Sequence, residues 1–296
     1  MKDGRRIPRV LRRDSLVIVS RKDGFVFMHN PKVGGSSVRA VLEKYRDPDV
    51  DLFGIDPEPT SSLHRIDRAH MGIDEFSRFF PDVWQETKSL PYFVLYRDPF
   101  KRFLSSINEY CRVYGATDIR FAALPERRRV FLELTERLDR LGRAEAVMDA
   151  LDLTHFRPQW IYMQPPEGIS LRLRAFDLKD MEEFTTELSL CLGAQLDFSR
   201  ENSSEQFDIP GPLQVVLANN SIKKQLRRLP GATWAMGQLR KRSSGTAQSD
   251  RQLSATGRYG LTEAEAQTAE SFVARFYARD FAFLEGLSVT PAAVEA

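Results

Sequence analysis

The sequence predicts an α/β fold of three layers, in which helices flank a central parallel sheet. Two short apolar runs, residues 25–29 and 92–96, are each followed by a loop and then by apolar residues at helical spacing. A strand, a loop and a helix in this order form the repeating unit of doubly wound α/β folds. The chain has 296 residues, of which 42% are hydrophobic. We therefore expect one domain that spans residues 1–296.

The first elements are a predicted hairpin and a helix. Residues 16–20 and 25–29 are apolar, and the tight-turn pair Asp23-Gly24 stands between them. A glycine-containing loop over residues 30–37 comes next. It leads to a predicted helix whose apolar face consists of Val38, Val41, Leu42 and Tyr45.

The remaining elements follow from the same periodicities and from turn residues. Residues 74–80 predict a short helix that ends at Pro81, and residues 92–96 predict a buried parallel strand. Further predictions are a helix that begins near Phe100, a long amphipathic helix over 125–151, a strand over 171–176, a helix over 179–192 that ends at Gly193, a loop-rich and partly mobile segment over 203–260, and a last helix that a capping box at 262–265 opens.

Composition and charge narrow the class of protein. The 43 basic and 41 acidic residues leave a formal charge of +2, which disfavours nucleic acid as a partner. No apolar run is long enough to span a bilayer, and the basic N-terminus is not followed by an apolar signal region before Asp14. Cys111 and Cys191 are too few for a disulfide framework or a zinc site. We therefore expect a cytoplasmic protein without a metal.

The loop over residues 31–37, Pro-Lys-Val-Gly-Gly-Ser-Ser, has the composition of an anion-binding loop. Two glycines allow the backbone N–H groups to turn toward an anion, and the following helix presents its positive end. Lys32 adds a full charge and the serines add hydroxyl donors. Because the lysine precedes the glycines, the order differs from the Walker A loop of ATP-binding proteins.

A second segment, residues 97–105, follows the next predicted strand. Arg97 comes at the carboxyl end of that strand, where open α/β sheets bind their ligands. Ser105 lies about two turns into the following helix. A guanidinium group and a hydroxyl that converge on one phosphate would bind it through several charge-assisted hydrogen bonds.

Together the two segments resemble those of sulfotransferases that use 3′-phosphoadenosine 5′-phosphosulfate (PAPS), the family that includes heparan and chondroitin sulfotransferases. Residues 31–37 are similar to the family's 5′-phosphosulfate loop, and Arg-Asp-Pro-x-x-Arg-x-x-Ser over 97–105 is similar to its 3′-phosphate motif. Weaker similarity extends to residues 154–159, 176–183 and 276–281, whereas residues 203–261 match no family element. The resemblance implies a P-loop-like fold and a PAPS site formed by Lys32, Val33, Gly34, Gly35, Ser36, Ser37, Arg97 and Ser105.

The resemblance also implies a reaction, the transfer of a sulfuryl group from PAPS to a hydroxyl of an acceptor such as a glycan or glycolipid. Lys32 would stabilise the leaving phosphate as the sulfur–oxygen bond breaks. His70 resembles the base histidine of uronyl 2-O-sulfotransferases and is our candidate general base. Other candidates for the base are His64, His155, Glu43 and Asp74, whereas His29 is interpreted as a structural contact.

Two other functions remain open from the sequence. A nucleotide kinase or phosphotransferase could use the same loop, although the order of lysine and glycines disfavours it. A non-catalytic protein that binds adenosine phosphates would need both loops but no base. Neither the identity of the acceptor nor the oligomeric state is predicted by any motif.

Overall fold

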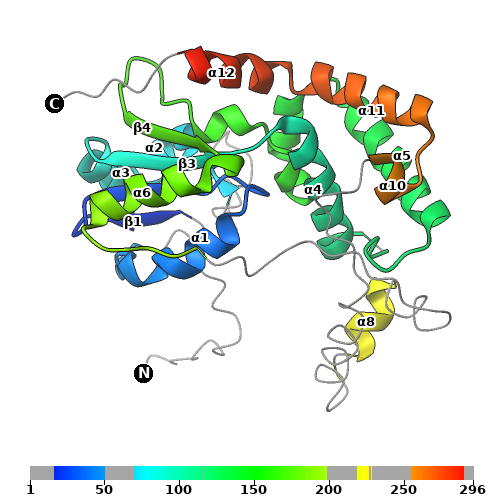
Figure 1. The fold of residues 1–296 in the computed structure, drawn as a ribbon, viewed down its shortest axis with the longest axis horizontal. Coiled ribbons are helices and arrows are strands. Elements are labelled where there is room, and N and C mark those ends of the chain that lie inside the picture. Colours follow the sequence, from blue (N-terminus) through cyan, green and yellow to red (C-terminus); the bar gives the residue numbers. More distant parts are fainter. Residues whose placement is uncertain are drawn as a thin grey trace, which may run out of the picture.

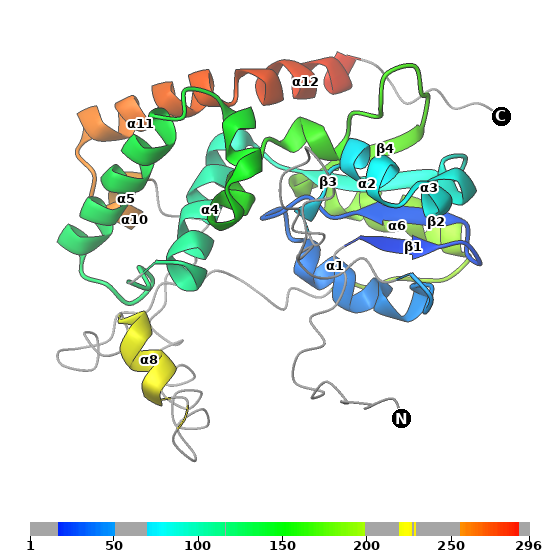
Figure 2. The same cartoon turned by 180° about the vertical axis from the view of Figure 1, so that it is seen from behind.

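The computed structural model describes residues 17–50, 70–115, 117–198, 219–226, 228 and 255–289 (Figures 1 and 2). Its strands are β1 (Ile18–Ser20), β2 (Phe25–Met28), β3 (Pro91–Tyr96) and β4 (Arg172–Asp177). Its α-helices are α1 (Gly35–Leu42), α2 (Ile73–Phe79), α3 (Pro81–Thr87), α4 (Pro99–Val113), α5 (Leu124–Asp139), α6 (Met181–Leu192), α8 (Asn220–Leu226), α10 (Ala255–Tyr259), α11 (Glu263–Phe276) and α12 (Ala278–Val289). Short 3₁₀ helices include η2 (Glu43–Tyr45), η4 (Ala144–Asp149), η5 (Leu151–Phe156), η6 (Gln159–Tyr162) and η7 (Leu178–Asp180).

The four strands form one sheet in the order β1-β2-β3-β4. β2, β3 and β4 run parallel, with Met28 opposite Val94 and Tyr96 opposite Asp177. β1 pairs antiparallel with β2 through the predicted hairpin, whose turn places Gly24 at φ 73°. The predicted parallel sheet is therefore confirmed for three strands, and an antiparallel strand is added at one edge.

Helices cover both faces of the sheet, as the two-residue period of the strands requires. On one face, Phe27, Phe93 and Phe176 pack with apolar residues of α1 and α6. On the other face, Met28 and Val94 pack with apolar residues of α2, α3, η6 and α12. The order of helix, sheet and helix confirms the three layers, and both views show α1 and α12 on opposite sides of the strands (Figures 1 and 2).

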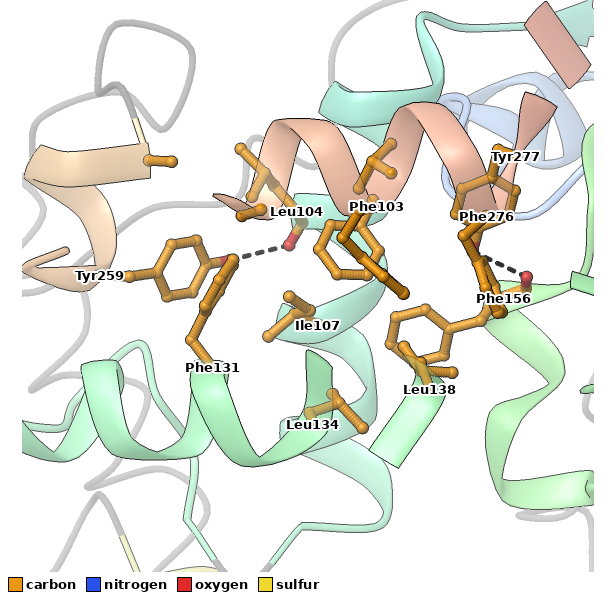
Figure 3. Packing of buried hydrophobic residues seen from close by; sticks show 14 of the residues in the cluster. Phe103, Leu104, Ile107, Phe131, Leu134, Leu138, Phe156, Tyr259, Phe276 and Tyr277 are labelled. Carbon is orange, nitrogen blue, oxygen red and sulfur yellow. Dashed lines mark hydrogen bonds between the residues drawn. The ribbon is translucent and has the colours of Figure 1, made fainter. Parts of the chain in front are cut away.

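A second apolar core lies beside the sheet and is made of helices alone (Figure 3). Phe103 of α4 contacts Phe131 of α5, Phe156 of η5 and Phe272 of α11 at ring-centroid distances of 5.8–6.1 Å. Tyr277 donates a hydrogen bond from its hydroxyl to the Phe156 carbonyl at 2.8 Å. Because α4 starts at the carboxyl end of β3, this helical core fixes the segment that carries residues 97–105.

One predicted helix boundary is wrong, and two predicted helices are each followed by a helix that was not predicted. The helix predicted over 125–151 ends at Asp139, because Gly142 has φ 75° and the chain then continues in the 3₁₀ helices η4 and η5. Pro81 ends α2 but also begins α3, a position in which its missing N–H has no cost. The capping box at Thr262 opens α11 as predicted, but α12 follows it.

The loop-rich segment predicted over 203–260 is also wrong in part. Residues 220–226 form α8 and residues 255–259 form α10. Asn220 fixes α8 to the end of α4, because its side-chain amide donates hydrogen bonds of 2.7 Å to the carbonyls of Cys111 and Gly115. The rest of the segment lies outside the described residues.

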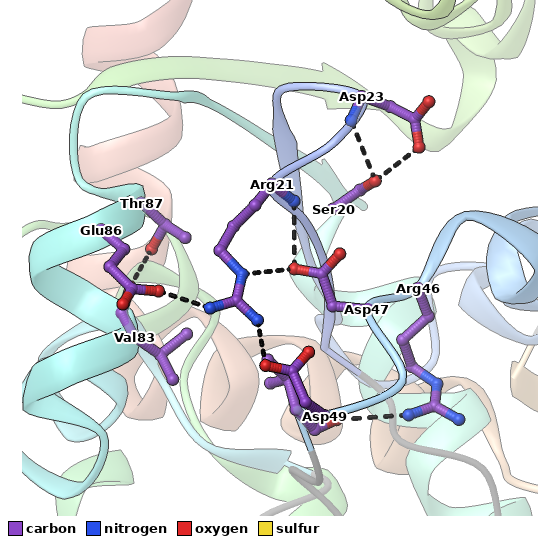
Figure 4. Close-up of polar contacts among 10 residues, drawn as sticks. Ser20, Arg21, Asp23, Arg46, Asp47, Asp49, Val83, Glu86 and Thr87 are labelled. Atoms are coloured by element: carbon purple, nitrogen blue, oxygen red, sulfur yellow. Dashed lines mark hydrogen bonds and ion pairs between the residues drawn. The ribbon is translucent and has the colours of Figure 1, made fainter.

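At the amino edge of the parallel strands, one arginine is enclosed by carboxylates (Figure 4). Arg21, just after β1, donates from Nε to Asp47 at 2.7 Å and from its two terminal nitrogens to Asp49 and Glu86 at 2.5 Å each. These hydrogen bonds raise the pKa of Arg21. They connect the hairpin to the chain after η2 and to α3.

Among the residues that the structure describes, no helix combines the length and hydropathy of a membrane span. Within the same ranges, no group of three or more His, Cys, Asp and Glu side chains is arranged to hold a metal ion.

Candidate functional site

The two predicted anion-binding segments leave the sheet at the same edge. β2 and β3 are parallel neighbours, so the loop after Met28 and the loop after Tyr96 both start at the carboxyl ends of adjacent strands. The end of β4 lies there as well, since a Cβ added to Gly34 would come within 2.9 Å of the Leu178 side chain. The sequence prediction that both segments face one crevice edge is consistent with this register.

The backbone of the first loop turns through left-handed conformations. Gly34, the N-cap of α1, has φ 82°, and Lys32 has φ 67°, which costs a residue with a side chain about 1–2 kcal/mol. Gly35 is required for a different reason, because an added Cβ would lie 2.3 Å from the His29 ring. One glycine therefore permits the turn, and the other makes room for an imidazole.

Lys32 is half-buried and forms an ion pair with a residue of α4. Its Nζ lies 3.3 Å from Oε2 of Glu109, and Glu109 also pairs with Arg112. Burial lowers the pKa of Lys32, although Glu109 acts in the opposite sense. Burial by itself raises the pKa of Glu109, but Arg112 and Lys32 hold it well below its ordinary value. The ammonium group of Lys32 is therefore held close to the sheet edge by a carboxylate of α4, the helix that begins within the second segment.

The structure describes the two serines of the first loop to different extents. The Ser37 side chain is half-buried, and the backbone N–H of Ser37 donates to the Gly34 carbonyl at 3.2 Å. Ser36 belongs to α1, but its side chain lies outside the described part. Val33 is buried in the core between the sheet and α1.

The second segment is a capped helix start. Asp98 is the N-cap of α4, its carboxylate accepts a hydrogen bond from the Lys101 N–H at 2.8 Å, and Pro99 occupies the first turn. Arg97 is half-buried directly before this cap, and Ser105 is buried within α4. The Asp-Pro pair of the motif thus has a structural role, which leaves Arg97 and Ser105 as the groups with ligand chemistry.

Gln159 of η6 connects the two loops. Its side-chain N–H donates to the Arg97 carbonyl at 2.7 Å, while its Oε1 accepts from the Arg97 N–H and from the Asn30 side chain at 3.1 Å each. Asn30 also donates to the Leu95 carbonyl. The N–H of Gln159 donates to Asp280 of α12 at 2.9 Å. One fully buried amide therefore fixes the relative positions of both segments.

Arg102 makes a second connection between the segments. Its side chain is 2% exposed, and its Nε donates to the Pro31 carbonyl at 3.0 Å. One of its terminal nitrogens, Nη2, is buried without a hydrogen-bond partner among the described residues. Burial raises the pKa of Asp280 to about 6, against the opposing effect of the Arg102 charge. The hydrogen bond from Arg102 to the Pro31 carbonyl therefore supports the loop that carries Lys32.

Three imidazole rings gather beside the Lys32 loop. The rings of His70 and His155 have centroids 4.9 Å apart, and those of His29 and His70 are 6.3 Å apart. His29 and His155 are buried, whereas His70 is half-buried. Burial and then the neighbouring charge of His70 keep the pKa of His29 well below its usual range. The interpretation of His29 as a structural contact is consistent with its packing on Gly35.

The other candidates for the base lie elsewhere. Asp74 is exposed and pairs with Arg78, and Glu43 pairs with Arg46 in the 3₁₀ turn after α1. His64 lies outside the described residues. Of the predicted bases, His70 and His155 are thus the ones that the structure describes near the loop of Lys32.

Sequence reasoning missed the residues that hold the site together. Asn30, Gln159 and Asp280 are neutral or acidic groups far apart in the chain, and only their place in weak family-like stretches could have indicated them. Arg157 and Glu75, which hold the His70 backbone, are 82 positions apart. Arg157 lies in the weakly family-like stretch 154–159, and Glu75 lies in no such stretch.

Comparisons with protein-family models, with curated proteins and with solved structures return no match for this chain.

Proposed function

We propose that this protein is a PAPS-dependent sulfotransferase with a P-loop-like fold that transfers a sulfuryl group to a hydroxyl of an acceptor, a glycan or glycolipid. The observation that carries the proposal is that residues 30–35 and 97–105 leave adjacent parallel strands at one edge and are joined through Gln159 and Arg102. A ligand with anionic groups at two separated positions suits such a pair of loops.

In the proposed reaction, the acceptor oxygen attacks the sulfur in line with the bridging oxygen of the phosphosulfate. The sulfur–oxygen bond to the phosphate breaks, and 3′-phosphoadenosine 5′-phosphate leaves. Lys32 neutralises the charge that develops on the leaving phosphate, and His70 takes the proton of the acceptor hydroxyl. The Arg97 guanidinium and the Ser105 hydroxyl bind the ribose 3′-phosphate.

Three features of the loops support this assignment of roles. Lys32 is next to the left-handed turn at Gly34, where the N–H groups at the start of α1 can bind an oxyanion. Its partner, Glu109, lies on α4 one turn after Ser105, so Lys32 is in electrostatic contact with the helix that carries the second motif. His70 lies within the imidazole group beside this loop.

The decisive experiment is transfer of sulfur-35 from labelled PAPS to a panel of glycans, glycolipids and small alcohols. The proposal expects a labelled product without added metal. A parallel assay with ATP and Mg²⁺ tests a kinase, and tight nucleotide binding with no transfer to any acceptor would indicate a non-catalytic binding protein. Either of these results would overturn the proposal.

Binding of the nucleotide provides an independent test of Arg97. Arg97→Ala should weaken the binding of 3′-phosphoadenosine 5′-phosphate, measured by calorimetry, by about 10- to 100-fold. The reason is that a hydrogen bond to a charged group contributes about 1.5–3 kcal/mol. Adenosine 5′-phosphosulfate lacks the 3′-phosphate and should lose little affinity. Equal losses for both ligands would refute the role of Arg97.

A further inference from the structure

We propose that Arg157, held by Glu75, is a positioning residue that sets the place of the His70 imidazole, an inference that rests on the proposed role of His70 as general base. The geometry that points to it lies in the backbone of residues 70–72. No motif places Arg157 or Glu75 in a functional role.

The carbonyl of His70 is bound from two sides. Nη1 of Arg157 donates to it at 2.8 Å, and the hydroxyl of Tyr162 donates to it at 3.0 Å. Both donors come from the segment around η6, whereas His70 precedes α2. A carbonyl with two donors has little freedom to rotate, so the His70 Cα–Cβ direction is fixed with it.

Arg157 is itself fixed by a buried ion pair. Its two terminal nitrogens lie 2.9 and 3.0 Å from the two carboxylate oxygens of Glu75, and the two side chains are 2% and 3% exposed. This fork-to-fork geometry is specific to a guanidinium group. Glu75 also accepts from the Gly72 N–H at 2.8 Å, so that one carboxylate orients both Arg157 and the chain just after His70.

Close packing restricts the backbone of residues 70–72. A Cβ on Gly72 would lie 2.6 Å from the Ile161 carbonyl, and Met71 is fully buried. His70 is the first described residue after 51–69, which lie outside the described part. Two hydrogen bonds act on the His70 carbonyl and a third on Gly72, and the His70 ring lies 6.3 Å from that of His29 and 4.9 Å from that of His155.

A buried ion pair is a costly way to stabilise a fold, because apolar residues of the same size often stabilise as well or better. Its specific contribution here is direction: it places an N–H donor at the His70 carbonyl. General-base catalysis depends on such placement, and an error of about 1 Å can lower the rate about 100-fold.

The test compares Arg157→Lys with Tyr162→Phe in the full chain. Lysine keeps the charge opposite Glu75 but cannot form both hydrogen bonds of the fork and reach His70 as well. We expect kcat to fall about 10- to 100-fold in Arg157→Lys and by less in Tyr162→Phe. The KM for PAPS and the affinity for 3′-phosphoadenosine 5′-phosphate should stay within about twofold, because the nucleotide loops are untouched.

The second readout does not depend on activity. The chain has four histidines, so their ring carbons can be followed by NMR, with the His70 signal assigned through His70→Gln. We expect the His70 signal to shift in Arg157→Lys, while Asp47→Asn, at the opposite edge of the sheet, leaves it unchanged. The rings of His29, directly after β2, and of His155 in η5 lie beside that of His70, and the signals of these two histidines are followed in the same spectra.

An unmoved His70 signal together with an unchanged kcat in Arg157→Lys would overturn the positioning role. A kcat loss that is accompanied by an equal loss of nucleotide affinity would also overturn it, because that pattern indicates a general structural effect. If even the wild-type protein transfers no sulfuryl group, the proposed function fails, and the NMR signal still decides whether Arg157 positions His70.

Discussion

The two edges of the sheet differ in whether their polar and charged side chains have hydrogen-bond partners. At the amino edge, the charge of Arg21 is matched by three carboxylates, and every terminal nitrogen has a partner (Figure 4). At the carboxyl edge, Nδ1 of His29, Oδ1 of Asn30 and Nη2 of Arg102 are buried without a hydrogen-bond partner among the described residues. Buried polar groups are rarely left in this way. The difference is that the amino edge satisfies its charged side chain internally, whereas the carboxyl edge leaves these polar atoms without a partner among the described residues.

The largest effect is expected at the imidazole group of the carboxyl edge. His70→Ala should lower kcat by about 10²–10⁴, the usual contribution of a general base, with little change in the affinity for 3′-phosphoadenosine 5′-phosphate. Steady-state kinetics at several pH values measures this. A variant whose pH–rate profile matches the wild type would assign the base elsewhere.

Lys32→Ala should lower kcat by about 10²–10³, because a charge at the leaving oxygen is lost. Lys22 is an exposed lysine of the hairpin at the opposite edge, so Lys22→Ala is a matched control that should keep the wild-type rate. Single-turnover assays with saturating PAPS separate this chemical effect from binding. Similar rates for the two variants would remove the functional difference between the edges.

Glu109→Gln tests the ion pair that joins the two loops. Since Arg112 and Lys32 hold the pKa of Glu109 below its ordinary value of 4.5, its contribution to stability is present above about pH 4.5 and is lost as the pH falls below it. The variant should be less stable by up to about 1 kcal/mol at pH 7, since the pair is partly exposed. It should lose less stability than the wild type between pH 5 and pH 3, as measured by urea unfolding. A parallel loss in both proteins would contradict this.

The smallest effect is expected at the amino edge. Arg21→Gln should lower the unfolding midpoint by about 2–4 °C, the shift of roughly 1 kcal/mol in a chain of this size, and should leave kcat and nucleotide affinity unchanged. Differential scanning calorimetry and the sulfur-35 assay check the two halves of the statement. A large loss of activity would show that the two edges are coupled.

The sequence was sufficient for features that are local. The turn at Gly24, the start of α1 at the glycine pair and the cap at Thr262 all follow from short patterns, and each is confirmed. The prediction of one helix over 125–151 is wrong because apolar residues at helical spacing continue past Gly142, whereas the helical backbone does not. Spacing alone does not report where a chain turns.

The ties that shape the candidate site could not be predicted in the same way. Gln159 contacts Asn30 across 129 positions and Asp280 across 121 positions. A glutamine or an aspartate has many possible partners, and nothing in the local sequence selects one of them. Lys32, Arg97 and His70 could be chosen as candidates from their neighbours in the chain, whereas their relative placement depends on the fold.

The hydrogen bonds from the Gln159 and Trp160 N–H groups to Asp280 have a consequence for synthesis of the protein. α12 carries this carboxylate, yet the loops that it stabilises belong to the first third of the chain. A nascent chain that has emerged only as far as α11 would lack the acceptor that holds η6 in place. Assembly of the two loops is therefore coupled to the arrival of Asp280, which follows Gln159 by 121 positions in the chain.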